Sequence, residues 1–472
     1  MKKTFLLCFA AALLLSSCGA AQTTEIGETD ADPVSETVVT EDTSLKPDLP
    51  ELDYNGAEFR IFHNDCGGNN FDVVSDGLNG ELLNDIVFQR NLDTEERFNI
   101  HLVPNIQTGD TLGDTVIRAI TAGDDSCEMI LTAGISLTKL ISMNLTHDLT
   151  DSMPYMDLSK PWWSQDFQNN TKINGKLYAI TGDISHIALE SLQFLTFNRN
   201  LFYANDLEAP YQAVRDGTWT FDKFQSLIKD YSGDLDGDGK ISLANDRFGY
   251  LIHESIMPAS YVYTNDVHIC EYQDGVPYLN LDVEKITDVS KAYRELVNSN
   301  LVSDAVFGTD GCAAFLADRI LFMDCTMRTV RSHFREMKSD FGLVPFPKFD
   351  ESVPRYTVIV GREANITAVP VTTEKTEMIS AVLEYMAYYG YTYITPIYYD
   401  TILGDKLMRD QDSRDMMEIL RESMYFDFGN WCGLQSLQFN SLINSKSEPA
   451  SYIASNQAKM EKELSKFLES VS

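Results

Sequence analysis

The sequence lacks the short motifs that mark most nucleotide-binding proteins and many enzymes. Neither of its two Gly-Lys pairs has the upstream glycine and the following Ser or Thr of a P-loop. No G-x-S-x-G motif occurs, and His253 begins only half of an H-E-x-x-H motif, because Met257 stands where the second histidine belongs. The many carboxylates single out no acid and base pair of a glycosidase. Nothing in the sequence therefore demands an enzyme.

Positive charge is also scarce. The chain has 37 Lys and Arg residues against 71 Asp and Glu residues, which gives a formal net charge of −34. Nucleic-acid phosphates and anionic lipid headgroups would both be repelled by such a chain. We therefore expect no nucleic-acid partner and no direct adhesion to a membrane surface.

Cysteines are few, and none of them forms a C-x-x-C pair. A zinc ribbon and a thioredoxin-like redox motif are therefore both excluded. The even number of cysteines that follow Cys18 would permit disulfides, but we expect most of them to be buried thiols. These cysteines are Cys66, Cys127, Cys270, Cys312, Cys325 and Cys432.

The sequence has only one long apolar run, and it stands at the N-terminus. Lys2 and Lys3 precede an apolar stretch of residues 5–15, which is too short to span a bilayer and is typical of a secretory signal. The following Leu-Ser-Ser-Cys resembles a bacterial lipobox, which implies cleavage after residue 17 and a lipid on Cys18. The alternative is an ordinary signal peptide followed by an incidental cysteine.

Residues 18–51 form a distinct segment of low apolar content. They are rich in Thr, Glu, Asp and Pro, so they cannot bury a core, and we expect a disordered tether. The predicted arrangement is a body outside the cytoplasm that is held at the cell membrane only by the lipid on Cys18.

The rest of the chain, about 420 residues, is more than one hydrophobic core usually holds, so two lobes are expected. Strands predicted at 57–65 and 127–134 alternate with helices, which favours an α/β fold with largely parallel sheets. Ligands bind beyond the carboxyl ends of such strands. The strand ends at 63–65 and 132–136 are therefore the first places to expect a site.

Residues 234–246, DLDGDGKISLAND, form the most specific local motif and resemble the calcium loop of an EF-hand. Three aspartates stand at positions one, three and five, and Gly239 permits the turn at position six. Position twelve is Asn245 instead of an acidic residue, and Asp246 comes one residue late. A solvated acidic turn is the alternative. We expect a structural calcium ion, with ligands from Asp234, Asp236, Asp238, the Lys240 carbonyl, Asn245 and Asp246.

An ordered set of segments resembles bacterial extracellular solute-binding lipoproteins of family one, the maltose-binding-like receptors of ABC importers. The segments are KPWWSQDFQNNTKINGKLYAITGDIS, FNRNLF, GTWTFDKF, DLDGDGKISLANDRFGY and FGLVPFPKFD. The resemblance runs from about residue 51 to the C-terminus. It implies a periplasmic-binding-protein-like fold of type II, in which two α/β lobes are joined by a hinge of crossing strands. The implied N-lobe comprises residues 52–190 and 317–360, and the C-lobe comprises residues 191–316 and 361–472.

The resemblance also implies a function and candidate contacts. The chain would be a monomer that captures a carbohydrate and presents it to the permease subunits of an importer. We expect this carbohydrate to be an oligosaccharide. Carboxylates can accept hydrogen bonds from sugar hydroxyls, and aromatic rings can stack on the flat faces of sugars. Trp219 is expected to pack within the protein instead of contacting a ligand. The candidate ligand contacts are Asn64, Asp65, Trp162, Trp163, Asp183, Asp324 and Trp431.

Three alternatives remain open at this point. A receptor for a peptide or an organic acid would need a basic cluster, for which Arg328 and Arg362 are the candidates. A surface glycosidase would need a carboxylate pair across the site. A glycan-binding surface protein without an importer would share the fold and the ligand.

Overall fold

The computed structural model describes most of the chain that follows the predicted tether. The described residues are 45–65, 73–75, 77–108, 111–253, 258–299, 302–304, 310–334, 337–361, 364–402, 411–431 and 439–471. The predicted signal peptide, Cys18, nearly all of the tether, Cys66, Arg362 and Cys432 lie outside them. Leu45–Ser472 forms one compact unit.

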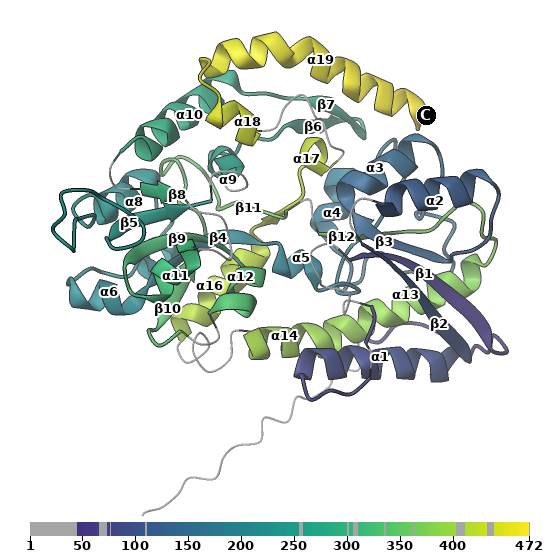
Figure 1. Cartoon of the computed structure of the whole chain (residues 1–472). Coiled ribbons are helices and arrows are strands. Elements are labelled where there is room, and N and C mark those ends of the chain that lie inside the picture. The colour runs from purple at the N-terminus through teal and green to yellow at the C-terminus, as the bar shows by residue number, and fades with distance from the viewer. Residues whose placement is uncertain are drawn as a thin grey trace, which may run out of the picture. The chain divides into compact units, whose positions relative to one another are not determined.

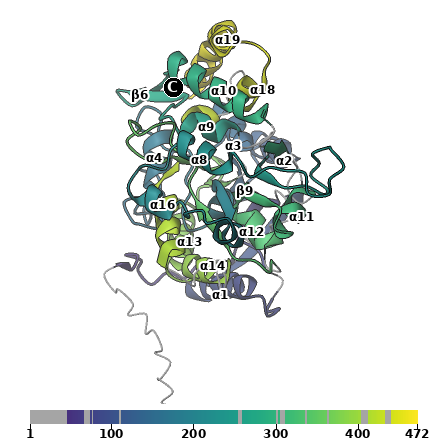
Figure 2. The same cartoon turned by 90° about the vertical axis from the view of Figure 1, so that its left-hand side faces the viewer.

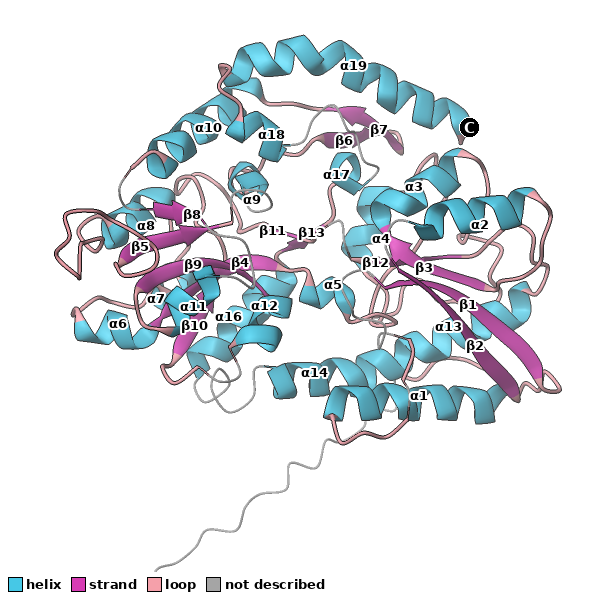
Figure 3. Cartoon of the chain, viewed as in Figure 1, coloured by secondary structure: helices cyan, strands magenta, loops and turns pink. Residues whose placement is uncertain are grey.

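The N-lobe is built on a four-stranded sheet in the order β12-β3-β1-β2. Its strands are β1 (Ala57–Asp65), β2 (Ile100–Thr108), β3 (Met129–Ala133) and β12 (Asn365–Ala368). β1 runs parallel to both β2 and β3, while β12 is antiparallel to β3. Helices α1 (Leu82–Phe98), α2 (Thr111–Thr121) and α3 (Gly134–Ser142) connect or follow these strands (Figure 3). The strand and helix alternation expected from the sequence is confirmed here.

The C-lobe is built on a five-stranded sheet in the order β10-β4-β9-β5-β8. β5 is parallel to β8 and β9, and β4 is antiparallel to β9 and β10. The strands are β4 (Gln193–Asn198), β5 (Phe248–Ile252), β8 (Val302–Asp304), β9 (Ile320–Thr326) and β10 (Phe341–Val344).

This strand order corrects the expected lobe boundaries. Residues 317–360 were assigned to the N-lobe, but β9 and β10 within them pair with β4 of the C-lobe sheet. Conversely, β12 was assigned to the C-lobe and pairs with β3 of the N-lobe. β1, β2 and β3, which all precede residue 190, lie together in the N-lobe sheet.

Three crossing segments run side by side between the lobes and form the hinge. Leu192 and Val360 form an antiparallel bridge, and the Gly361 amide donates to the Ser191 carbonyl over 3.2 Å. β11 (Val358–Ile359) pairs in parallel with β13 (Met424–Tyr425). Because a hinge needs only a few residues to absorb backbone rotation, short pairs of this kind suit relative motion of two lobes.

The remaining helices cover the two sheets and the hinge. In the N-lobe and at the crossings they are α4 (Gln165–Thr171), α5 (Ile187–Glu190), α13 (Thr376–Tyr389), the π-helix η3 (Gly390–Ile394) and α14 (Thr395–Ile402). In the C-lobe the first are α6 (Arg199–Ala204), α7 (Tyr211–Arg215), α8 (Phe221–Ile228), α9 (Pro258–Tyr263), α10 (Val283–Val297), α11 (Asp310–Leu316) and α12 (Met327–His333). The last are α16 (Gln411–Glu422), α17 (Phe428–Trp431), α18 (Phe439–Asn444) and α19 (Pro449–Ser470), beside the hairpin β6 (Cys270–Gln273) and β7 (Val276–Leu279).

The expectation that Trp219 packs in the core is confirmed, and two helices show how their residues form a cap and a buried face. The Thr220 side chain caps α8 by accepting from the Lys223 amide, and Trp219 is fully buried against Phe322, with its Nε1 donating to the Pro345 carbonyl over 2.9 Å. Met460, Leu464 and Phe467 are buried on one face of α19.

The C-terminal helix α19 joins the two lobes along one side. It contacts α10 and α18 of the C-lobe and also α3 of the N-lobe. At its end, Asn144 Nδ2 donates to the Ser470 carbonyl over 2.7 Å. Figures 1 and 2 show α19 on the opposite side of the compact unit from α1 and α14.

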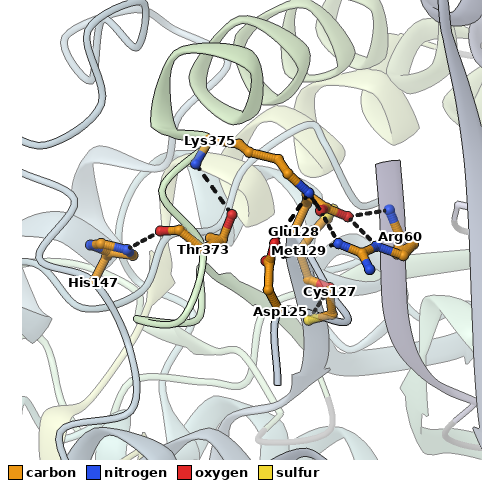
Figure 4. Close-up of polar contacts among 8 residues, drawn as sticks. All are labelled: Arg60, Asp125, Cys127, Glu128, Met129, His147, Thr373 and Lys375. Atoms are coloured by element: carbon orange, nitrogen blue, oxygen red, sulfur yellow. Dashed lines mark hydrogen bonds and ion pairs between the residues drawn. The ribbon is translucent and has the colours of Figure 1, made fainter. Parts of the chain in front are cut away.

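A buried charge network holds the amino ends of β1 and β3 together (Figure 4). Glu128 is fully buried; its Oε2 accepts from the Arg60 amide at 2.6 Å, and its Oε1 accepts from Lys375 Nζ at 2.7 Å. Burial alone would raise the pKa of Glu128, but the hydrogen bonds from Arg60 and Lys375 hold that pKa below its usual value. The network lies at the opposite end of the sheet from the expected ligand edge, so we assign it a structural role.

The described cysteines Cys127, Cys270, Cys312 and Cys325 are buried thiols, as expected. None of the helices in the described part of the chain combines the length and the apolar character needed to cross a bilayer.

Candidate binding site between the lobes

The candidate site is the interlobe region, which we define by the carboxyl ends of β1, β3 and β9 together with the hinge. The carboxyl ends of β1 and β3 share one edge of the N-lobe sheet, where ligands usually bind, while β9 ends in the separate C-lobe sheet. β3 ends at Ala133, and β9 ends at Thr326, which caps α12 by accepting from the Thr329 amide over 3.2 Å. One predicted aromatic residue, Trp431, connects this edge of the N-lobe to the C-lobe.

Trp431 is the last residue of α17, in the segment that follows the β13 crossing, and its ring contacts the N-lobe and Phe428 of its own helix. Its amide donates to the Asp427 carbonyl over 2.8 Å, while its own carbonyl accepts from the Thr138 hydroxyl of α3 over 3.3 Å. The ring meets Phe167 edge to face at 5.4 Å. A Cβ atom at Gly134 would lie only 2.7 Å from Trp431 Cδ1, so the missing side chain there makes room for the indole.

The indole nitrogen of Trp431 is the unusual feature of this contact. The side chain is only 5 % exposed, and Nε1 has no hydrogen-bond partner among the described residues. A buried donor left without an acceptor costs about 1–3 kcal/mol, so an acceptor that reached it would be stabilising. An acceptor brought by a ligand would satisfy it.

Trp162 and Trp163 do not lie at this site. Both rings are buried in the core of the N-lobe, which contradicts the expectation that one of them faces a ligand. Trp163 Nε1 donates to Oε2 of Glu384 over 2.8 Å, and Trp162 meets Tyr388 edge to face at 5.5 Å. The close approach of Gly182 to the Trp162 carbonyl fixes this packing.

Asp183 follows this packed segment and braces a helix. Its Oδ1 accepts from the Thr395 hydroxyl over 2.6 Å, and its backbone carbonyl lies 1.7 Å from where a Cβ of Gly390 would stand. Burial raises the pKa of Asp183 to about 6, although the hydrogen bond from Thr395 lowers it. Its contact to a ligand remains a prediction, and its observed partner is α14.

Asp324 is fully buried, and both of its oxygens have partners within the C-lobe. The Tyr250 hydroxyl donates to one oxygen, and the His253 amide donates to the other over 3.1 Å. Burial raises the pKa of Asp324 to about 7, against the lowering effect of the bond from Tyr250. The carboxyl group therefore joins β9 to the end of β5, and in this structure it is not available to a ligand.

The other two predicted contacts lie at the end of β1. The backbones of Asn64 and Asp65 pair with Gln107 and Thr108 of β2, while their side chains lie outside the described part of the structure. The neighbouring His63 is fully buried, and its Nε2 lies 3.4 Å from Asn365 Nδ2 of β12. The structure thus brings the ends of β1 and β12 together, a contact that sequence spacing alone does not reveal.

A second feature that sequence reasoning missed is an ion-pair cluster on the crossing helix α5. Glu190 is fully buried, and its Oε1 lies 2.6 Å from Nε of Arg331, while its Oε2 lies 3.5 Å from Nε of Arg328. The Nε and Nη2 atoms of Arg328 are buried and make no hydrogen bond among the described residues. Arg328 was noted in the sequence, but nothing there indicated Glu190 as its partner.

The predicted calcium loop partly has the expected arrangement. One carboxylate oxygen from each of Asp234, Asp236 and Asp246 lies within 4.8 Å of the others. Asp246, and not Asn245, therefore stands with the aspartates at positions one and three; Asn245 Nδ2 instead donates to Asp236 Oδ2 over 2.9 Å.

The carboxylates of this loop also organise its backbone. Asp246 accepts from the amides of Leu235 and Ser242, both over 2.7 Å, and these bonds lower the pKa of Asp246. Asp238 accepts from the Lys240 amide and is not among the three clustered carboxylates. The donor set of hard oxygens fits calcium.

Comparison with known proteins places the fold. No family model and no curated protein matches the sequence. Three solved structures are similar over 87 % of this chain, each at 11–14 % identity. One is the maltose/maltodextrin-binding domain MalE from Bdellovibrio bacteriovorus bound to maltotriose, with a TM-score of 0.53 and 100 % of that chain covered.

Two further solved structures among those that match are similar to a comparable extent. A cyclo/maltodextrin-binding protein complexed with maltotetraose has a TM-score of 0.56, with 97 % of that chain covered. An ABC substrate-binding protein from Listeria monocytogenes in complex with cycloalternan has a TM-score of 0.56, with 99 % covered. The chain therefore has the type II periplasmic-binding-protein-like α/β fold that the sequence resemblance implied.

Proposed function

We propose that this chain is an extracytoplasmic solute-binding protein that captures an oligosaccharide between its lobes and delivers it to an ABC importer. The observation that carries the proposal is Trp431, an aromatic residue held between the lobes whose buried Nε1 has no partner among the described residues. The shared fold supports it, because the three similar proteins are described as sugar-binding or as bound to maltotriose, maltotetraose or cycloalternan.

In such a protein, closure of the two lobes at the hinge reports that a ligand is bound. Contacts that a ligand makes with both lobes at once exist only when the lobes are closed, so binding shifts the population toward the closed form. The short pairings between Leu192 and Val360 and between β11 and β13 are the segments that would absorb the rotation. An importer would distinguish the two forms by their surfaces.

The sequence indicates two partners, the ATP-hydrolysing subunits of an importer and the membrane. The chain has no P-loop, so ATP hydrolysis would belong to the importer's own subunits. The lipobox-like sequence before Cys18 supports anchoring by a lipid, and the acidic tether would keep the body away from the membrane surface.

Calorimetric titration of residues 19–472 against neutral oligosaccharides tests this function. The panel would contain maltotetraose, cycloalternan, cellotetraose, xylotetraose and mannotetraose. We expect one of them to bind with one-to-one stoichiometry. Trp431→Ala should weaken that binding by roughly tenfold or more, since an aromatic contact contributes about 0.5–1.5 kcal/mol beyond its buried area.

Two matched variants sharpen the test. Trp431→Phe keeps an aromatic ring and removes the Nε1 donor, so an intermediate loss would separate stacking from hydrogen bonding. Tyr203→Ala removes an aromatic side chain that is 89 % exposed on α6, and it should leave binding unchanged. Binding of no oligosaccharide in the panel, or equal affinity in Trp431→Ala and Tyr203→Ala, would contradict the proposal.

One observation favours a different ligand class within the same fold. The buried Nη2 donor of Arg328, whose Nε already faces Glu190, would suit a carboxylate on a peptide or an organic acid. Titration with tetragalacturonate, citrate and a tetrapeptide distinguishes this case. Binding of any of them that is lost in Arg328→Gln, without binding of a neutral sugar, would replace the carbohydrate assignment.

We also propose that calcium binds the loop at residues 234–246 and holds it folded. The three clustered carboxylates repel one another unless a cation lies among them. Calcium should therefore raise the melting temperature of residues 19–472 relative to buffer with a chelator, because it binds only the folded loop. Asp234→Asn should abolish the rise, whereas an equal melting temperature with calcium and with chelator would refute calcium binding.

A further inference from the structure

A pocket on the outer side of the N-lobe lies apart from the interlobe region. It has a volume of about 480 Å³, within the range of small-ligand sites. Its walls come from three parts of the chain: the segment that begins the folded body, the helix α1, and the continuous helix formed by α13 and η3. The lining residues are Lys46, Pro47, Asp93, Arg97, Tyr385, Tyr388, Tyr389 and Tyr393.

The four tyrosines form one aromatic wall. Tyr389 and Tyr393 lie with ring centroids 4.7 Å apart, and Tyr385 lies 6.4 Å from Tyr388 and 6.3 Å from Tyr389. Tyr385, Tyr388 and Tyr393 are half-buried, so part of each side chain remains accessible. The rings are fixed by one another and do not need a ligand to order them.

The polar groups stand on the facing helix α1, which packs against α13 and η3. Asp93 and Arg97 are one helical turn apart, so their planar side chains lie on the same face of α1. The Arg97 guanidinium lies 5.2 Å from the ring centroid of Tyr385, and its Nη2 donates to the Leu49 carbonyl over 3.4 Å. Burial and the neighbouring Asp93 carboxylate raise the pKa of Tyr389, so its phenol stays protonated as a donor.

A π-helical turn shapes this wall. η3 (Gly390–Ile394) lies between α13 and α14, and π-helical turns occur often at functional sites. Its first residue, Gly390, has no room for a side chain because the Asp183 carbonyl lies against it. The turn is therefore fixed by packing on the inner side of the helix, and Tyr393, which lies within η3, lines the pocket.

The chemistry of the lining selects among ligand classes. Among the described lining residues Pro47 is the one aliphatic side chain, so a lipid chain or an aliphatic peptide side chain would find few aliphatic partners there. The two cations Lys46 and Arg97 disfavour a quaternary ammonium group, which aromatic cages otherwise accept. Aromatic rings beside a carboxylate and a guanidinium match a sugar, whose C–H faces lie on rings and whose neighbouring hydroxyls pair with planar polar groups.

We propose that this tyrosine pocket is a second carbohydrate-binding site, which holds a sugar unit on the outer surface of the N-lobe. The site takes the same ligand class as the proposed function but uses no residue of the interlobe region. Its role would be to retain a glycan near the receptor while shorter pieces enter between the lobes.

Saturation-transfer NMR on residues 19–472 tests the proposal with defined probes. These are maltotetraose, cellotetraose, xylotetraose, mannotetraose, chitotetraose and tetragalacturonate. Tyr393→Ala should weaken the binding of at least one probe by roughly tenfold. The same probe should lose affinity in Asp93→Asn, which removes a charge without removing bulk. Tyr203→Ala is the matched control, because it deletes an exposed tyrosine elsewhere.

The outcomes separate this site from the interlobe site. A probe that loses affinity in Tyr393→Ala but not in Trp431→Phe binds the tyrosine pocket, even if the interlobe function fails. Loss in Trp431→Phe alone, for every probe, overturns the pocket proposal while the proposed function stands. If Tyr393→Ala does not fold, Tyr393→Phe and Asp93→Asn decide the question, and unchanged affinity for all probes in both variants overturns it.

Discussion

The buried carboxyl group of Glu384 should make the stability of this protein depend on pH in a defined direction. Glu384 lies on α13 with 1 % of its surface exposed, and its Oε2 accepts from Trp163 Nε1 over 2.8 Å and from the Asp157 amide over 3.3 Å. Burial raises the pKa of Glu384 from 4.5 to about 7, although the hydrogen bond from Trp163 lowers it.

The size of the effect follows from the two pKa values. Between pH 4.5 and about 7 the folded protein holds a proton on Glu384 that the unfolded chain has released. The protonated carboxyl group therefore makes its full contribution to the free energy of unfolding below pH 4.5. That contribution is lost as the pH rises through about 7. At about 1.4 kcal/mol for each pH unit, the loss amounts to about 3 kcal/mol.

The variant Glu384→Gln tests this reasoning, because it keeps the shape and an acceptor for Trp163 but cannot ionise. Urea unfolding, followed by tryptophan fluorescence, should show the variant more stable than the wild type by up to about 3 kcal/mol at about pH 8. The two proteins should have nearly equal stability at about pH 4.5. Glu377→Gln, at an exposed position of the same helix, is the control and should change little.

A stability difference between Glu384→Gln and the wild type that does not change with pH would refute the assignment of a raised pKa. A variant less stable than the wild type at about pH 8 would show that the ionised carboxylate is stabilising, which contradicts the reasoning directly.

Three further outcomes are expected. Glu128→Gln should destabilise the protein by about 2 kcal/mol near neutral pH, because it breaks the buried pair with Arg60. The difference in stability between variant and wild type should vanish as the pH falls below 4.5, and acid unfolding would measure it. Gly390→Ala should cost about 3 kcal/mol or more in urea unfolding, since its Cβ would collide with the Asp183 carbonyl, and an unchanged midpoint would contradict the packing of η3. Cys18→Ser should release the protein from the membrane fraction of expressing cells, and retention there would rule out lipid anchoring at this residue.

The sequence predicted local structure well and long-range pairing poorly. β1, α1, β2, β3 and β4 follow the apolar periodicity, because alternation and helix caps are local properties. The pairing of β9 and β10 with β4 was not predicted, and residues 317–360 were expected in the wrong lobe. Strand partners depend on the whole topology, since β9 and β12 are each similar to many other apolar strands.

At the candidate site, too, local features could be predicted from the sequence and long-range contacts could not. Trp431 could be singled out because few tryptophans occur, but its contact with Gly134 joins residues about 300 positions apart and has no local signature. Trp162 and Trp163 follow a proline in a loop-like segment, so nothing in the sequence indicated their burial against α13. The tyrosine pocket has no local signature either, because it requires α1 to face α13 and η3.

Small-angle X-ray scattering tests the central claim most directly, because oligosaccharide capture by two hinged lobes must change the shape of the protein. Residues 19–472 would be measured alone and with a saturating concentration of each oligosaccharide in the titration panel. The account expects at least one neutral oligosaccharide to lower the radius of gyration, and Trp431→Ala to prevent the decrease at the same concentration. A radius of gyration unchanged by every oligosaccharide would contradict capture between the lobes.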